Sequence, residues 1–406
     1  MAINRKKKND LLTIGIFILF PIFSFPLLLY MIYNKRKWAL YLLAILIALI
    51  SLKFLPVMDL YRHTMDYYYF KNQDFNEFIS ANRLDFTLYI CSFILGKCGI
   101  PFEFLRFIFV LTSYLISFYI YENITHLLNI VNNKERFRLF LCFLFIVPFI
   151  AVSLGLRFGF ASSIMLLAIY EFYIKNNKIK SFILICFSIF SHFSMLAFAL
   201  LIPISHRIKL NFRPMTILIF STSLSVVAFS LFSMIVEIIP NEYLLNKISF
   251  YTGDGIYGGT NAITTNTWQN LFRFMSRFIK PIIIYFTILF ICKNTTLRNY
   301  LVCTLFFICL LYPNISPMLR YSLFVSEIGL LCLAVSSFFF SSTKSWLFVF
   351  MLGIACFLEI YADRNAILAE RFLTLTYIPL PFHFFYHDEL NFMINNFDSE
   401  GYYIHF

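Results

Sequence analysis

The chain has 406 residues, of which 60% are hydrophobic and only 13% are charged. Soluble globular domains carry about 25% charged residues, so this composition excludes an ordinary soluble protein. The net charge of +12 comes largely from Lys and Arg at the ends of apolar runs, a pattern typical of cytoplasmic membrane flanks. It does not indicate a nucleic-acid partner.

Apolar segments follow one another along nearly the whole chain. They cover residues 11–33, 38–57, 84–100, 104–121, 139–156, 159–174, 181–204, 214–239, 278–292, 299–316, 321–342 and 345–361, with a weaker segment at 372–386. Runs of this length are typical of membrane-spanning helices. The sequence therefore predicts an all-α, polytopic integral membrane protein with about 10–13 transmembrane or re-entrant helices.

Two of these segments have basic residues at both ends, although one crossing would separate those ends. The flanks are RKKK (5–8) and KRK (35–37) around residues 11–33, and KNNKIK (175–180) and HRIKLNFR (206–213) around residues 181–204. The sequences PIFSFP (21–26) and FSHFS (190–194) in their middles predict a break in each segment. With both segments broken, the loops 58–83 and 240–277 and Arg320 fall on the outer side of the membrane.

The rest of the chain leaves little room for a soluble domain. Residues 1–387 are predicted to form a single transmembrane helical domain, and the polar, acidic residues 388–406 a surface tail.

The basic sequence NKERFR (133–138) also looks cytoplasmic, and the pair of segments within 84–121 does not fit the topology proposed above. No internal repeat is visible, which weighs against a transporter built from inverted halves.

One arginine and one histidine stand in otherwise apolar sequence. Arg157 lies in AVSLGLRFGFASSI (151–164), and His192 follows it by 35 residues. Ionisable groups inside a membrane usually face the protein interior or a water-filled cavity and mark a functional site. The alternatives are that Arg157 occupies a tight turn at the membrane surface and that His192 is a core histidine bonded to a neighbouring serine.

Two further groups of cations are candidates for anion binding. Arg273, Arg277 and Lys280 are spaced i, i+4, i+7, so they share one face of a helix and are predicted to clamp a diphosphate. A helix lying at the membrane surface explains them equally well. Arg320 and Tyr321 begin an apolar segment, and they are interpreted either as a ligand contact or as an ordinary flank.

The stretch after the second apolar segment mixes acids, bases and aromatic rings. Asp59, Arg62, His63 and Asp66 accompany four tyrosines, namely Tyr61, Tyr67, Tyr68 and Tyr69. A carboxylate beside aromatic rings suits sugar recognition, and Asp59 or Asp66 is a candidate general base. The alternative is an aromatic belt at the membrane surface with ion pairs inside the loop.

The chemistry of a metal or cofactor site is not indicated. The nine cysteines form no CxxC motif and no Cys/His cluster with metal-ligand spacing. They nearly all lie within or beside apolar runs and are interpreted as small hydrophobic residues. We expect neither a metal nor a cofactor.

Several short motifs together resemble a known family. They are DLYR (59–62), MDYYYF (65–70), GKCGIPFEFLRFI (96–108), LRFGFA (156–161), SHFS (191–194) and the pair Arg320–Tyr321. In this order they resemble the EpsG/Wzy group of bacterial O-antigen and exopolysaccharide repeat-unit polymerases. The resemblance spans most of residues 38–325. The tyrosines of MDYYYF crowd after the aspartate, which leaves open whether Asp59 or Asp66 matches the acid of the family.

The resemblance implies a glycosyltransferase with a GT-C-like helical bundle in the bacterial inner membrane, its active site facing the periplasm or exterior. Such an enzyme joins oligosaccharide repeat units carried on undecaprenyl diphosphate and works beside a flippase and a chain-length regulator. Catalytic roles would fall to Arg157, His192, Asp59 and Asp66. Substrate-binding roles would fall to Arg62, Tyr67, Arg273, Arg277, Lys280, Arg320 and Tyr321. The alternatives are a flippase for lipid-linked oligosaccharides and a membrane O-acyltransferase acting on surface glycan.

Overall fold

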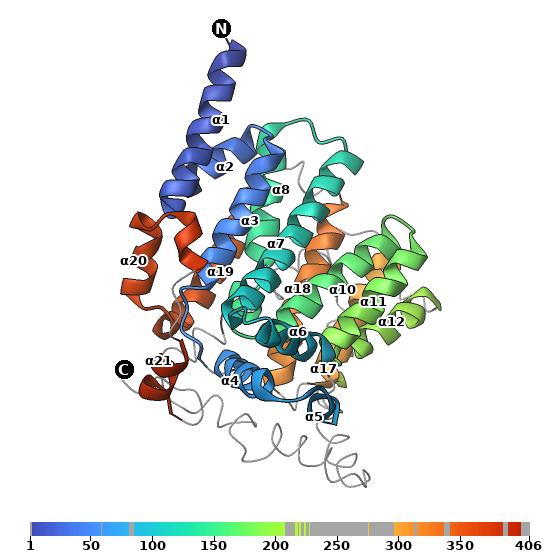
Figure 1. Ribbon diagram of the computed structural model, residues 1–406. Coiled ribbons are helices and arrows are strands. Elements are labelled where there is room, and N and C mark those ends of the chain that lie inside the picture. The colour runs from blue at the N-terminus through green and yellow to red at the C-terminus, as the bar shows by residue number, and fades with distance from the viewer. Residues whose placement is uncertain are drawn as a thin grey trace. The chain divides into compact units, whose positions relative to one another are not determined.

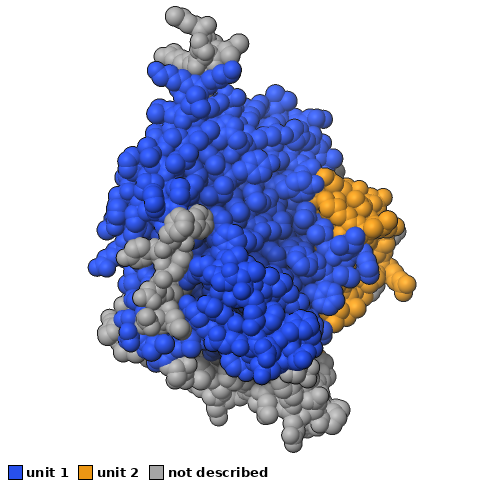
Figure 2. All heavy atoms as spheres, in the orientation of Figure 1, with its two compact units in different colours: residues 1–167, 182–195, 363–406 blue, residues 168–181, 196–362 orange. Residues whose placement is uncertain are grey.

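The computed structural model describes residues 2–57, 59–80, 85–207, 296–311, 315–336, 342–384 and 389–398, with a few isolated positions between 216 and 275. Within these ranges the chain is helical, and its β-structure is a single bridge between Phe54 and Ile367. The chain divides into two compact units (Figure 2). The first comprises residues 1–167, 182–195 and 363–406, and the second comprises residues 168–181 and 196–362.

The first unit contains most of the helices drawn in blue and teal in Figure 1. They are α1 (Ala2–Leu19), η1 (Pro21–Ser24), α2 (Phe25–Tyr33), α3 (Lys37–Ser51), α4 (Asp59–Asn72), α5 (Phe75–Ser80), α6 (Phe86–Lys97), α7 (Phe102–Leu127), α8 (Asn133–Ile146), α9 (Phe149–Ser153) and most of α10 (Arg157–Tyr173) and α11 (Lys178–Ser191). Its C-terminal part adds η3 (Arg364–Ala366), α20 (Ala369–Tyr377), η4 (Leu380–Phe384) and α21 (Glu389–Asn396).

The first apolar segment is a hairpin, as its two basic flanks predicted. Pro21 begins the short η1 helix after α1, and the chain then reverses into α2. The carboxylate of Asp10 near the start of the segment lies 3.3 Å from the guanidinium of Arg36 just after its end. The two ends therefore lie together, and the predicted break at residues 21–26 is confirmed.

Helices α3 and α7 run antiparallel through the middle of the first unit (Figure 1). At one end, Glu122 of α7 lies 3.4 Å from the ammonium of Lys37 and 3.0 Å from the guanidinium of Arg136. We call this the basic end, since KRK and NKERFR meet there. At the other end Arg106 donates to the carbonyl of Phe54 at 3.0 Å. The 26 residues of α7 span about 39 Å between the two ends.

The described part of the predicted outer loop at 58–83 is helical. In α4, Leu60, Thr64, Tyr67 and Phe70 are buried along one face, at the spacing of an amphipathic helix. The many polar residues of this stretch occupy the remaining surface, which made it look like a loop. The Tyr67 hydroxyl donates to the carbonyl of Ile100 at 2.6 Å and so fixes α4 beside the start of α7.

The C-terminal residues pack more closely than the predicted surface tail. In α21, Met393 is buried, and it joins Phe397 and Leu55 in one hydrophobic cluster. The backbone N–H of Leu55 donates to Ala366 at 2.7 Å. The sequence carries apolar residues at 393 and 397, which a helix places on one face, and this spacing explains the difference.

The second unit consists of the end of α10, the start of α11, and α12 (Met195–Arg207), α17 (Thr296–Leu310), α18 (Ile315–Ala334) and α19 (Ser342–Ala362). The hydroxyls of Tyr173 and Ser205 lie 2.8 Å apart, and Tyr300 donates to the carbonyl of Phe198 at 3.1 Å. Helix α11 ends at Ser191 and α12 begins at Met195, so the break predicted at FSHFS is confirmed.

Two described helices are long and apolar enough to cross a membrane, namely Phe102–Leu127 and Thr343–Ala362. Shorter apolar helices accompany them, among them Lys37–Ser51 and Thr296–Leu310. These helices agree with the expectation of a helical membrane protein. The single-domain organisation and the GT-C-like arrangement stay predictions.

Candidate active site

Arg157 stands at a sharp turn between α9 and α10, where two glycines are required by close packing. A Cβ atom on Gly159 would lie 2.5 Å from the Cα of Val152, and one on Gly155 would lie 2.7 Å from the carbonyl oxygen of Ala151. At both positions the neighbouring backbone is too close to leave room for a side chain. The tight turn considered for Arg157 from the sequence is therefore present, and it presents the arginine at the first position of α10.

The Arg157 guanidinium is paired. Its Nη1 atom lies 2.8 Å from a carboxylate oxygen of Asp85 and 3.2 Å from the hydroxyl of Tyr89, to which it donates. Asp85 immediately precedes α6 and Tyr89 lies one turn further along it. A charge-assisted bond of this length offsets part of the cost of placing a cation in an apolar region.

Asp85 also holds the turn that contains His192. Its second carboxylate oxygen accepts the backbone N–H of Phe193 at 2.9 Å. Beside it, the Ser191 hydroxyl donates to that of Thr87 at 3.0 Å. One carboxylate thus connects the two residues that the sequence singled out in apolar surroundings.

His192 is oriented by the serine that follows it. Its Nδ1 accepts the backbone N–H of Ser194 at 3.3 Å, and the Ser194 hydroxyl lies 2.6 Å from the same nitrogen. An accepting Nδ1 places the proton on Nε2. The imidazole meets the ring of Phe158 edge-on at 5.7 Å. This agrees with the serine-bonded histidine considered from the sequence.

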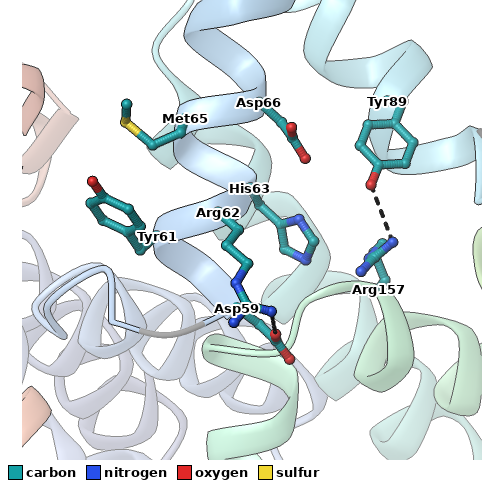
Figure 3. A pocket seen from close by; sticks show the side chains of 8 residues that line it. All are labelled: Asp59, Tyr61, Arg62, His63, Met65, Asp66, Tyr89 and Arg157. Atoms are coloured by element: carbon teal, nitrogen blue, oxygen red, sulfur yellow. Dashed lines mark hydrogen bonds and ion pairs between the residues drawn. The ribbon is translucent and has the colours of Figure 1, made fainter. Parts of the chain in front are cut away.

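A cavity of about 620 Å³ lies between α4, α6 and the start of α10 (Figure 3). It brings together two carboxylates, two guanidinium groups, one imidazole and two phenol rings. The lining residues are Asp59, Tyr61, Arg62, His63, Met65, Asp66, Tyr89 and Arg157. Asp59 lies 3.6 Å from Arg62 across one turn of α4. The cavity therefore offers groups for binding an anion and for accepting a proton.

His63 is the most buried polar side chain in this lining. Only 3% of its surface is exposed, and neither ring nitrogen has a hydrogen-bond partner among the described residues. Burial is the main cause that lowers the pKa of His63 to about 3, and the nearby charge of Arg157 adds to it. The imidazole is therefore neutral at physiological pH.

The structure brings together four of the predicted site residues. Asp59, Arg62, Asp66 and Arg157 line the cavity. Two predicted residues of the same unit are absent from the lining: His192, and Tyr67, whose hydroxyl is bound to Ile100. Arg320 and Tyr321 belong to α18 in the second unit, where the Tyr321 ring packs against Phe198. Arg273, Arg277 and Lys280 lie outside the described residues. The roles of all these residues stay predictions.

Three residues of the site were given no role from the sequence. His63 was noted only as part of the charged stretch, and Asp85 and Tyr89 were not noted. A signal for the last two exists, since they are spaced i, i+4 at the start of an apolar helix and so share a face. No sequence pattern indicates that this face meets Arg157, 68 residues away from Tyr89.

Within the described ranges, no three or more His, Cys, Asp or Glu side chains gather in a way that would hold a metal ion. Within the cavity Arg62 lies 3.6 Å from Asp59, and Arg157 is paired with Asp85, which lies outside the lining. The cationic chemistry that this site offers comes from arginine. The expected absence of a metal stays a prediction.

Comparison with known proteins gives one match. The sequence model of the EpsG family matches residues 37–377, which include every lining residue of the cavity as well as Asp85 and His192. No curated protein and no solved structure matches the chain.

Proposed function

Because the chain belongs to the EpsG family, we propose that it is an integral-membrane glycosyltransferase that polymerises oligosaccharide repeat units. Its substrates would be repeat units linked to undecaprenyl diphosphate, and its product an O-antigen or exopolysaccharide chain. Membership of the family supports a polysaccharide-polymerase-like membrane protein. The proposal that the substrates are repeat units linked to undecaprenyl diphosphate is argued from the cavity.

The observation that supports this proposal best is the pairing of Arg157 at the wall of a charged cavity. Binding sites for small molecules typically have volumes of about 300–1,000 Å³, so 620 Å³ suits a sugar with part of its diphosphate. Arginine binds phosphate through two parallel N–H donors. Asp85 and Tyr89 contact Nη1, whereas Nε and Nη2 of Arg157 make no hydrogen bond within the described part of the chain. Those donors are proposed to bind the diphosphate.

The reaction forms one bond and breaks one. A hydroxyl oxygen of the acceptor sugar bonds to the anomeric carbon of the donor, whose bond to the diphosphate oxygen breaks. The diphosphate leaves with the electron pair, and Arg157 and Arg62 stabilise its added charge. Arg273, Arg277, Lys280 and Arg320 remain proposed diphosphate contacts, and Tyr67 and Tyr321 proposed sugar contacts.

The hydroxyl proton needs an acceptor. Asp66 and Asp59 both line the cavity, and either carboxylate can take the proton. Asp59 lies 3.6 Å from Arg62, an ion pair that a bound diphosphate would compete for. His192 remains a proposed catalytic residue, and Asp85 holds the turn that carries it.

The arrangement of the first unit supports an active site at the outer face. The cavity is lined by α4, α6 and the start of α10, and α4 is bound to the start of α7 through Tyr67. The basic end lies at the opposite end of α7, where Lys37 and Arg136 meet Glu122. Since basic flanks mark the cytoplasmic side, the cavity is proposed to face the periplasm or exterior. A flippase would deliver the substrate there, and a separate regulator would set chain length.

Deleting the gene tests the proposal against its alternatives. A polymerase deletion leaves single repeat units on the outer glycolipid, and Arg157→Ala at a normal protein level reproduces that state. A flippase deletion traps lipid-linked units inside the cell. An acyltransferase deletion leaves full-length chains that lack acyl groups. Either of the last two outcomes would replace the proposed function.

A further inference from the structure

His63 is a buried polar group whose ring has no hydrogen-bond partner among the described residues. Its side chain lies between Arg62 and Arg157 in Figure 3 and lines the cavity. A neutral imidazole carries one N–H donor and one acceptor nitrogen, and neither is satisfied by the described residues. A buried polar group left unsatisfied carries a free-energy cost. Such a cost at the wall of a cavity indicates that a ligand supplies the missing partner.

The charges around the ring determine which kind of ligand atom suits it. Arg157 faces it from α10, Asp59 and Arg62 from α4, and His192 from the turn after α11. Arg157, Arg62 and His192 disfavour a positive charge on the His63 ring. Of the four neighbours, Asp59 is the one that favours it. A neutral imidazole at this place suits a group that both accepts and donates a hydrogen bond, which describes a sugar hydroxyl.

We infer that His63 is a substrate-binding residue whose neutral imidazole hydrogen-bonds a sugar hydroxyl of the lipid-linked repeat unit. The inference rests on the proposed function for the identity of the ligand. It separates the tasks in the cavity: the arginines bind the diphosphate, a carboxylate accepts the proton, and His63 binds the sugar.

The experiment uses the purified full chain and repeat-unit lipid extracted from cells that lack the gene. Binding of this lipid and polymer formation are measured for wild type, His63→Asn, His63→Gln and His63→Leu. Asn places an amide near the position of Nδ1 and Gln near that of Nε2, so each can replace one hydrogen bond without titrating. Thr64→Val is the matched control, because Thr64 is buried on the same helix and its hydroxyl donates to the Leu60 backbone.

The expected results follow from the loss of one hydrogen bond. His63→Leu weakens lipid binding and raises KM by about tenfold. One of His63→Asn and His63→Gln retains binding within a few-fold of wild type, with an unchanged pH profile, and thereby identifies the contacting nitrogen. Thr64→Val behaves as wild type in both measurements.

Three outcomes would overturn the inference. Equal lipid binding by His63→Leu and wild type would show that the ring makes no contact. Loss of kcat in all three His63 variants with normal binding, together with loss of the acid limb of the wild-type pH profile, would make His63 the base. Failure of the wild-type protein to bind the lipid would show that the repeat-unit lipid is not the ligand of His63. Wild type that binds the lipid without polymerising it would contradict the proposed function only, since binding still decides the role of His63.

Discussion

The Asp85 carboxylate joins Arg157 to the turn that carries His192. One oxygen lies 2.8 Å from Nη1 of Arg157, and the other accepts the Phe193 N–H at 2.9 Å. Both side chains of the ion pair are mostly buried, with 26% of Arg157 and 15% of Asp85 exposed. We therefore expect Asp85 to be a positioning residue, because it contacts Arg157 without lining the cavity itself.

We predict that Asp85→Ala lowers polymerisation by about tenfold to a hundredfold, since an unfixed guanidinium loses its alignment with the diphosphate. Asp85→Asn keeps an acceptor for the Phe193 N–H and should lose less. Tyr89→Phe keeps the ring and removes the 3.2 Å hydrogen bond to Arg157, so it should cost a few-fold at most. Polymer yield per unit of purified protein measures each effect. Wild-type yield from Asp85→Ala would show that the ion pair does not position Arg157.

The two cavity carboxylates are expected to respond differently to the loss of charge. Replacing the general base by an amide should lower kcat by about 10²–10⁴-fold with little change in KM. Replacing the other carboxylate should act mainly on binding. Asp59→Asn and Asp66→Asn are therefore compared by kcat and KM separately. Equal and small effects on kcat in both variants would exclude both aspartates as the base.

We predict that His63 makes the protein less stable in acid. Its pKa is about 3 in the folded chain, chiefly because it is buried, against an ordinary value of about 6.5. Below the ordinary value the unfolded chain binds a proton that the folded chain does not, so stability falls as the pH falls. From pH 7 to pH 5 the loss should be about 2 kcal/mol.

Thermal unfolding in detergent at the two pH values measures this loss, with His63→Gln as the comparison. Between pH 7 and pH 5, the variant should lose about 2 kcal/mol less stability than wild type. Equal losses of stability in wild type and variant would show that His63 is protonated as easily in the folded chain as in the unfolded chain.

A natural cysteine reports the side of the membrane on which the cavity lies. Cys98 is exposed, whereas the other described cysteines are buried or half-buried. It precedes Ile100, whose carbonyl accepts the Tyr67 hydroxyl of α4. A membrane-impermeant maleimide should therefore label Cys98 in intact cells.

The matched variant places a cysteine at the basic end. Lys134→Cys in a Cys98→Ser background should be labelled only after the cells are permeabilised, since Lys134 lies beside Arg136 at the start of α8. Cys98→Ser alone gives the background signal. Labelling of Cys98 only after permeabilisation would place the cavity on the cytoplasmic side and contradict the proposed orientation.

Much of the fold could be predicted from the sequence, because helix breaks and basic flanks are local signals. The hairpin around Pro21 and the break at His192 both follow from short motifs. The helix α4 was missed, since its polar residues outnumber its buried ones, although Leu60, Thr64 and Tyr67 already have helical spacing. That KRK and NKERFR lie at the same end of α7 was not indicated by the sequence, because it depends on contacts of Lys37 and Arg136 with Glu122.

The candidate site could be predicted only in part. Arg157 was noticed because a cation in an apolar run is costly. Its partner Asp85 lies 72 residues away in the sequence, and such a pairing depends on how α6 packs against α10. The same holds for His63, whose significance comes from its burial and from the lack of a hydrogen-bond partner in the part of the chain that the structure describes. Neither property is visible in a single sequence.

The central claim is that Arg157 binds the diphosphate of a lipid-linked repeat unit that this protein polymerises. The most direct measurement adds the purified chain to repeat-unit lipid extracted from cells that lack the gene and resolves the products on a gel. Wild type should give a ladder of increasing chain length. Arg157→Ala, folded as judged by its thermal unfolding, should give only the single unit, and Arg157→Lys far less polymer than wild type, since lysine lacks the two parallel donors. A full ladder from Arg157→Ala would contradict the account.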